Sequence, residues 1–101
     1  IINCAAVTDT DLCEKEPELA YRVNALGARN LSIVARKTGA KMVQISTDDV
    51  FDGIRHTPYT EFDDTNPKTV YGRSKRAGEN YVKEFTYEWV TGCTDMVDTT
   101  L

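Results

Sequence analysis

Two short apolar segments on either side of a long amphipathic one constrain the fold of this chain more than any other feature. Residues 1–6 and 41–46 carry β-branched and other apolar side chains and are typical of buried parallel strands. Between them, apolar residues recur at helical spacing from Glu18 to Lys37, and Gly39 supplies a stop signal. A strand, a long helix and a second strand predict the βαβ unit of a parallel sheet, and therefore an α/β fold.

The second half of the chain predicts one more helix after a long polar loop. Residues 50–69 contain Gly and Pro and few apolar side chains, which is typical of a functional or disordered loop. Residues 70–85 show helical periodicity, and Gly78 inside this helix indicates close approach of another element. Beyond it we expect at most a short strand around residues 89–90, and the start of another helix within residues 95–101.

The residues that directly follow the two predicted strands are candidates for a ligand site. In open α/β sheets the ligand cleft lies beyond the carboxyl ends of the strands. The second strand leads into Thr47 and Asp48, and the first strand leads into residues 5–8. Topology therefore predicts that these two segments border a ligand site.

Tyr71 and Lys75 are four residues apart in the second predicted helix, so they share one of its faces. If this face borders the cleft, the Lys75 ammonium lowers the pKa of the Tyr71 phenol from its ordinary value of about 10. A phenol tuned toward neutral pH can pass a proton to a substrate oxygen. The same spacing also occurs by chance on solvated helix faces, so the spacing alone leaves both interpretations open.

Composition and charge exclude several classes of protein. The 101 residues carry a net charge of −4, whereas a nucleic-acid binder is expected to carry an excess of basic residues. No apolar run approaches the roughly 18 residues that a membrane helix needs. Cys4, Cys13 and Cys93 show no framework or metal-binding spacing, so we expect reduced thiols in a cytoplasmic protein. Because the chain opens on a predicted strand and without Met, we expect part of one domain.

Several common types of site find no support in the sequence. No glycine-rich phosphate loop can be drawn through the six glycines. His56 is the single histidine and lies in the loop, so we expect no metal site. A hydrolase built on Ser46 or Ser74 lacks the nucleophile elbow. Asn24 lies beside the apolar stripe of its helix, where a solvated role and a buried hydrogen-bonding role both remain open.

Four stretches of the chain form a recognisable set: Ile-Ile-Asn-Cys-Ala-Ala-Val-Thr at residues 1–8 and the segments within residues 18–27, 44–53 and 67–79, the last holding Tyr-Gly-Arg-Ser-Lys. Together they resemble the extended short-chain dehydrogenase/reductases, and within them the dTDP-4-dehydrorhamnose reductase family. The resemblance implies a Rossmann-like domain that binds NADPH or NADH. Residues 1–101 would form part of this domain, and the smaller substrate domain would be largely absent.

The resemblance also implies roles for single residues. Tyr71 would be the catalytic acid, Lys75 would hold the nicotinamide ribose, and Thr47 would hydrogen-bond the substrate keto oxygen. Asp48 and Trp89 would contact the sugar nucleotide. The cofactor would be lined by Ala6, Val7, Thr8 and Ile45. Asn24 would organise water near Lys75. The implied reaction reduces the C4 keto group of dTDP-4-dehydro-L-rhamnose to dTDP-L-rhamnose, a precursor of cell-wall polysaccharide.

The chain departs from the family pattern at two places. Asp49 stands where the reductases usually have Tyr, and Asp48-Asp49 resembles the Asp-Glu pair of the 4,6-dehydratases, although Asp49 and Asp52 also suit turns. The stretch from Phe85 to Trp89 looks too short for a strand that the family has there. A related dehydratase or epimerase, or a non-catalytic regulatory relative, therefore remains open. A dTDP-sugar is the expected ligand, and a homodimer is the assembly to test.

Overall fold

The computed structural model describes residues 1–55, 57, 59, 60 and 62–92. His56 and Cys93 lie outside the described residues, as does the helix start expected within residues 95–101. The elements in chain order are β1 (Ile2–Asn3), α1 (Thr10–Lys15), α2 (Pro17–Tyr21), η1 (Arg22–Leu26), α3 (Gly27–Thr38), β2 (Met42–Ile45), η2 (Asp48–Val50), α4 (Val70–Phe85) and β3 (Trp89–Gly92).

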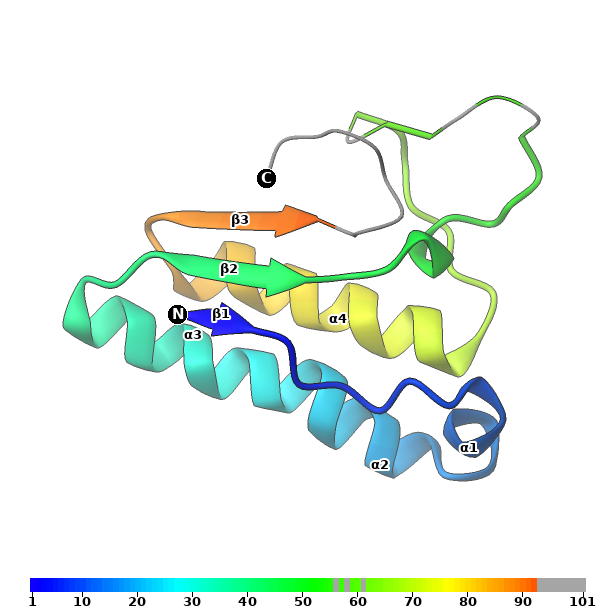
Figure 1. Ribbon diagram of the computed structural model, residues 1–101, viewed down its shortest axis with the longest axis horizontal. Coiled ribbons are helices and arrows are strands. Elements are labelled where there is room, and N and C mark those ends of the chain that lie inside the picture. The colour runs from blue at the N-terminus through cyan, green and yellow to red at the C-terminus, as the bar shows by residue number, and fades with distance from the viewer. Residues whose placement is uncertain (56, 58, 61, 93–101) are drawn as a thin grey trace.

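A three-stranded parallel sheet lies on a layer of helices, which confirms the predicted α/β class (Figure 1). The strand order is β1-β2-β3, with Val43 of β2 opposite Ile2 on one side and Val90 on the other. The helices α3 and α4 run side by side beneath the same face of the sheet. All strands point toward the side of the molecule where α4 begins, so the strand ends and the first turn of α4 share one edge.

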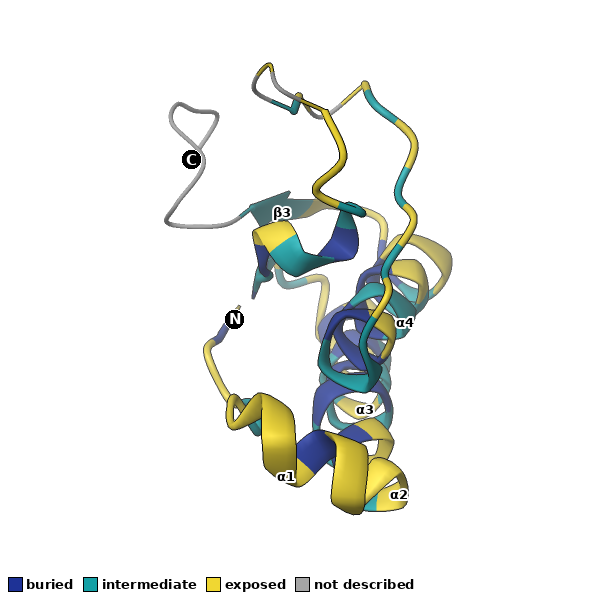
Figure 2. Ribbon diagram, turned by 90° about the vertical axis from the view of Figure 1, so that its right-hand side faces the viewer, coloured by how far each residue is buried: buried dark blue, intermediate teal, exposed yellow. Residues whose placement is uncertain are grey.

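The core between the sheet and the two helices is small and mixed in character. Its apolar part consists of Ala28, Ala35, Met42 and Val82, packed against Leu31 and Ala40. A buried polar pair lies on the same sheet face, where Asn3 Nδ2 donates to Gln44 Oε1 at 2.8 Å. Figure 2 shows the buried residues of α3 and α4 along their shared inner sides, whereas α1 and α2 are largely exposed.

The first strand is shorter than the predicted segment 1–6, because it ends at Asn3. The Asn3 side chain accepts a hydrogen bond from Ala5 N at 3.1 Å, which turns the chain away from the sheet directly after the strand. A short helix, α1, then forms between the first strand and the long amphipathic helix. Asp9 caps this helix by accepting from Leu12 N, and Cys13 is its buried residue.

The long helix predicted for residues 18–37 is present but interrupted. Helical backbone runs from Pro17 to Thr38, and the middle segment η1 is a π-helix centred on Asn24. Helices rarely adopt this geometry, and where they do a functional constraint is frequent. Gly39 ends α3 in the left-handed conformation at a φ of 73°, as its stop signal predicted.

The helix α4 has the bounds predicted for it, residues 70–85. Its first turn is capped by Thr69, whose side chain accepts from Gly72 N at 3.0 Å. Gly78 lies against η1, as its position inside a helix indicated. A Cβ added at Gly78 would come within 3.0 Å of the Asn24 carbonyl oxygen. Glycine at this position therefore lets α4 and η1 approach each other.

The structure confirms the short strand predicted around residues 89–90, since Trp89–Gly92 forms β3 and pairs with β2. The strand that the family has before its tryptophan therefore begins at Trp89 in this chain. Trp89 is thus the first residue of a strand and not, as the resemblance implied, a residue following one. Among the described helices, none has the length and hydropathy of a membrane span.

Candidate active site

Lys75 is buried at the carboxyl end of β2. It is 3% exposed, and its Nζ donates to the carbonyl oxygen of Ile45, the last residue of the strand, at 2.8 Å. A buried ammonium requires hydrogen-bond partners or opposite charge. This bond fixes the cation at the edge of the sheet, so the solvated interpretation of the Tyr-x-x-x-Lys spacing is wrong for its lysine.

Tyr71 lies one turn before Lys75, half-buried in the first turn of α4. Gly72 brings this turn close to η2, because a Cβ added there would come within 3.0 Å of the Asp49 carbonyl oxygen. Glu14 of α1 also reaches this turn, where its Oε2 accepts from Val70 N at 2.7 Å. The start of α4 is therefore held from two sides next to Tyr71.

Thr47 follows β2 and caps η2. Its Oγ1 accepts from Asp49 N at 3.2 Å and lies 3.5 Å from Asp48 Oδ1, toward which it donates. The second contact is at the limit of a hydrogen bond, so a better acceptor can compete for the hydroxyl proton. Thr47 is almost buried, whereas Asp48 is exposed beside it.

Asn24 connects the loop after β1 to α4, which decides in favour of its buried hydrogen-bonding role. It is 1% exposed. Its Oδ1 accepts from Val7 N at 2.8 Å, and its Nδ2 donates to Val7 O at 3.1 Å and to Ser74 Oγ at 3.0 Å. Ser74 donates in turn to Tyr71 O at 2.9 Å. Asn24 thereby holds the segment Ala6–Thr8 beside the helix that carries Tyr71 and Lys75.

The structure thus brings most of the predicted residues to one edge. The ends of β1 and β2 supply Ala6, Val7, Thr8, Ile45, Thr47 and Asp48, and α4 supplies Tyr71 and Lys75. Ala6 and Val7 are half-buried and Thr8 is exposed. The two serines considered as nucleophiles are engaged elsewhere, Ser74 as above and Ser46 with the Glu79 carboxylate.

Trp89 does not belong to this cluster. It pairs with Met42, the first residue of β2, and so lies at the opposite end of the strands from Thr47. Its ring lies under the Lys83 ammonium, with Nζ 5.6 Å from the ring centroid. In this fold the ligand edge is formed by the carboxyl ends of the strands, so Trp89 does not contribute to it.

Two acidic residues near the edge were missed by the sequence reasoning. Glu14 caps the start of α4, and Glu79 accepts from Ser46 at the end of β2. Glu79 carries a signal that could have revealed it, because it continues the four-residue spacing of Tyr71 and Lys75 on the buried face of α4. Glu14 carries no such signal, since its contact depends on how α1 packs.

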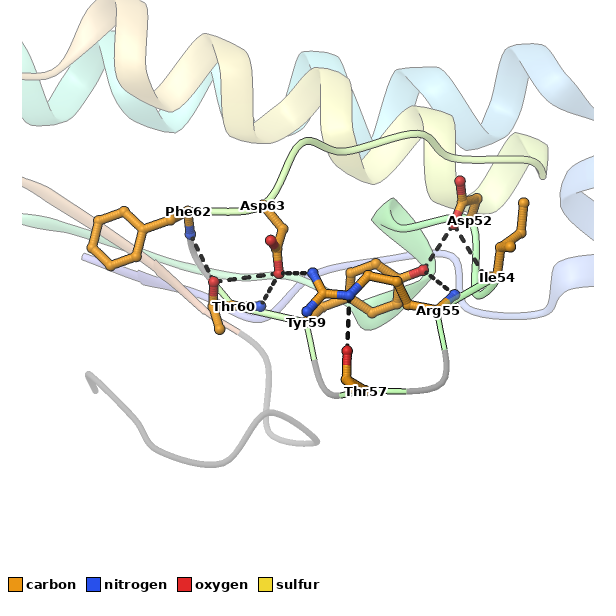
Figure 3. Close-up of polar contacts among 8 residues, drawn as sticks. All are labelled: Asp52, Ile54, Arg55, Thr57, Tyr59, Thr60, Phe62 and Asp63. Atoms are coloured by element: carbon orange, nitrogen blue, oxygen red, sulfur yellow. Dashed lines mark hydrogen bonds and ion pairs between the residues drawn. The ribbon is translucent and has the colours of Figure 1, made fainter.

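The loop between η2 and α4 is ordered by polar contacts in its described part (Figure 3). Asp52 accepts from Ile54 N at 3.1 Å and from Tyr59 OH at 2.8 Å, and these bonds hold the pKa of its carboxyl below the ordinary value. Arg55 lies over the Tyr59 ring and pairs with Asp63 at 2.6 Å. The Asp52 contribution to loop order is therefore present at neutral pH and is lost as pH falls through the lowered pKa. Asp52 is a turn former, as predicted.

Among the described residues, no group of three or more His, Cys, Asp or Glu side chains could hold a metal ion. The groups that the structure places around the strand ends include the Tyr71 phenol, the Lys75 ammonium and the Thr47 hydroxyl. A parallel α/β sheet with these groups at its carboxyl edge has the architecture of a Rossmann-like domain.

The chain belongs to the family of RmlD substrate binding domains, which it matches over residues 1–95. A dTDP-4-dehydrorhamnose reductase of Streptomyces griseus is 50% identical over 84 residues, covering 83% of this chain and 28% of the relative. A dTDP-4-dehydrorhamnose reductase of Clostridium acetobutylicum has a crystal structure with a TM-score of 0.90 at 49% identity, covering 91% of this chain and 33% of that one.

A second solved structure carries a cofactor. The dTDP-4-dehydrorhamnose reductase of Bacillus anthracis in complex with NADP has a TM-score of 0.90 at 48% identity, and the match covers 92% of this chain and 33% of that chain. The present chain spans between 25% and 35% of the length of the first curated relatives that it matches.

Proposed function

We propose that this chain supplies the catalytic edge of an NAD(P)H-dependent dTDP-4-dehydrorhamnose reductase. The observation that carries the proposal is the position of Lys75, which is buried at the end of β2 on the same helix face as Tyr71 and near Thr47. The names of the relatives support the same reaction, since they include several dTDP-4-dehydrorhamnose reductases at 44–50% identity.

The residues present fit the nicotinamide end of a dinucleotide. A buried cation, a phenol and the half-buried segment Ala6–Val7 adjoin one another at the strand ends, as a ribose and an apolar ring require. The sequence has no glycine-rich loop that would hold the pyrophosphate. When bound, the reduced nicotinamide supplies the hydride for C4 of the sugar.

Each residue then has a separate task in the reduction. Tyr71 donates its phenolic proton to the oxygen at C4 as negative charge develops there. Thr47 donates a second hydrogen bond to the same oxygen, in place of its long contact with Asp48. Lys75 holds the ribose and places positive charge near the Tyr71 phenol. Asp48 contacts the sugar in this proposal, which its exposed position beside Thr47 supports.

A 4,6-dehydratase or a non-catalytic relative fits the chain less well. The backbone carbonyl of Asp49 packs against α4, and its N–H is held by Thr47, as expected of a turn residue. A non-catalytic relative would have no need for a buried lysine at the strand end, because burying an ammonium disfavours folding.

We further propose a cytoplasmic protein whose partner is a dTDP-sugar. The free thiols of Cys4 and Cys13 fit a reducing compartment, and burial, followed by the charges of Asp9 and Glu14, raises the pKa of the Cys13 thiol. A net charge of −4 fits neither a nucleic acid nor an anionic membrane surface as partner. Assembly as a homodimer remains a prediction.

An assay of the full-length protein tests the proposed function. With dTDP-4-dehydro-L-rhamnose, we expect NADPH or NADH oxidation in a one-to-one ratio with formation of dTDP-L-rhamnose. With dTDP-glucose, we expect neither cofactor consumption nor a 4-keto product. Formation of the 4-keto-6-deoxy sugar from dTDP-glucose without net cofactor consumption would show a dehydratase instead.

A further inference from the structure

Glu79 is an acidic side chain to which the proposed reaction gives no task, yet it lies almost out of solvent. It is 7% exposed. It follows Lys75 by four residues and Tyr71 by eight, so the three side chains project from one side of α4. A carboxylate in such a place is unfavourable unless hydrogen bonds and opposite charge satisfy it.

Two side chains satisfy the Glu79 carboxylate. Arg76 Nη1 forms an ion pair with Oε1 at 3.2 Å, and Ser46 Oγ donates a hydrogen bond to Oε2. On its other side Ser46 is fixed by the neighbouring strand, since its backbone N donates to Gly92 O at 2.6 Å. Ser46 is therefore held by β3 and by α4 at the same time.

The hydrogen bond between Ser46 and Glu79 affects the proposed site because Ser46 directly precedes Thr47. Ser46 lies between Ile45, whose carbonyl accepts from Lys75, and Thr47, whose hydroxyl is proposed to donate to the substrate oxygen. Two consecutive residues at the end of β2 are thus fastened to α4 by side chains one turn apart. A shift of Ser46 would move Thr47 relative to Tyr71, and a misplacement of about 1 Å can lower a reaction rate about 10²-fold.

We propose that Glu79 is a positioning residue, which acts through Ser46 to fix Thr47 relative to Tyr71. The inference rests on the proposed function, because it concerns the geometry of that reaction. The carboxylate holds the serine hydroxyl, and the Arg76 ion pair holds the carboxylate. Strand end and helix then move as one unit.

A double-mutant cycle in the full-length protein tests this inference. We expect Ser46→Ala and Glu79→Ala each to lower kcat by about 10- to 100-fold, and the double variant to be no slower than the slower single one. Affinity for NADPH, measured by fluorescence, should stay unchanged. Glu79→Gln retains an oxygen that can accept from Ser46, so it should recover most of kcat. Glu84→Ala removes the same charge from the exposed side of α4 and should leave kcat unchanged.

Each result decides the matter. Single effects that multiply in the double variant, or a loss of thermal stability without a loss of kcat, would show a merely structural contact and overturn the inference while the reductase activity stands. A parent protein that does not reduce the sugar would overturn the proposed function and this inference with it. If Glu79→Ala does not fold, Ser46→Ala alone decides, because an unchanged kcat in that variant contradicts the inference.

Discussion

Tyr71→Phe in the full-length protein should lower kcat for sugar reduction by about 10²–10⁴-fold and leave the affinity for NADPH unchanged. The substitution removes only the phenolic oxygen, and the half-buried ring keeps its place in the first turn of α4. Lys75 remains bonded to the end of β2, so the part of the site that is proposed to hold the ribose is preserved. Steady-state kinetics for kcat and a fluorescence titration for the cofactor measure the two quantities separately.

Tyr81→Phe is the matched control for this variant. Tyr81 belongs to the same helix and is also half-buried, but its ring is stacked near Phe85, with centroids 6.1 Å apart, near the other end of α4. Removing its hydroxyl should leave kcat unchanged. If Tyr71→Phe turned over as fast as Tyr81→Phe, the assignment of Tyr71 as proton donor would be wrong.

Gly78→Ala should have the largest effect on stability. The added methyl group would come within 3.0 Å of the Asn24 carbonyl oxygen, and a backbone atom cannot move unless η1 moves with it. Overpacking of this kind costs up to about 3 kcal/mol, whereas replacing Gly by Ala inside a helix returns about 1 kcal/mol. We therefore expect a net loss of about 2 kcal/mol in the free energy of unfolding, measured by chemical denaturation.

Gly27→Ala separates the close approach from helix propensity. Gly27 also has helical backbone, with a φ of −60°, but a Cβ there meets its nearest neighbour, the Arg22 carbonyl oxygen, at an ordinary 3.8 Å. This variant should be stabilised by about 0.4–1 kcal/mol. Equal stability of the two variants would contradict the tight contact between α4 and η1.

Because Asn24 also holds Val7, Gly78→Ala should weaken cofactor binding as well.

Local sequence patterns predicted those elements whose ends are determined by residues close to them in the sequence. The helix over residues 70–85 was predicted with its bounds, because Thr69 caps it and the apolar period runs through it. Thr47 and Asp48 could be placed at the ligand edge from topology, since strand ends in a parallel sheet lie together. The spacing of Tyr71 and Lys75 left their position open, and only the resemblance to the reductases placed them at this edge. The helix stop at Gly39 and the close approach at Gly78 were also predicted correctly, because glycine is favoured where a side chain would not fit.

The remaining features depend on contacts between distant residues. The π-helical turn lies at Asn24, whose side chain bonds to Val7, 17 residues away. Glu79 contacts Ser46 across 33 residues. Its helical spacing predicts the face of α4 on which it lies, but the sequence does not reveal Ser46 as its partner. Trp89 was misplaced because the register between β2 and β3 belongs to the folded sheet and not to the local sequence.

In the proposed reaction, hydride passes to C4 of the sugar at the edge formed by Thr47, Tyr71 and Lys75. The most direct measurement uses the full-length protein, dTDP-4-dehydro-L-rhamnose, and NADPH or NADH deuterated at C4 of the nicotinamide on the transferred side. We expect dTDP-L-rhamnose with one deuterium at C4 of the sugar, detected by NMR, and none of this product with Tyr71→Phe on the same timescale. Product without deuterium at C4, or equal labelling by the Tyr71→Phe variant, would contradict the claim.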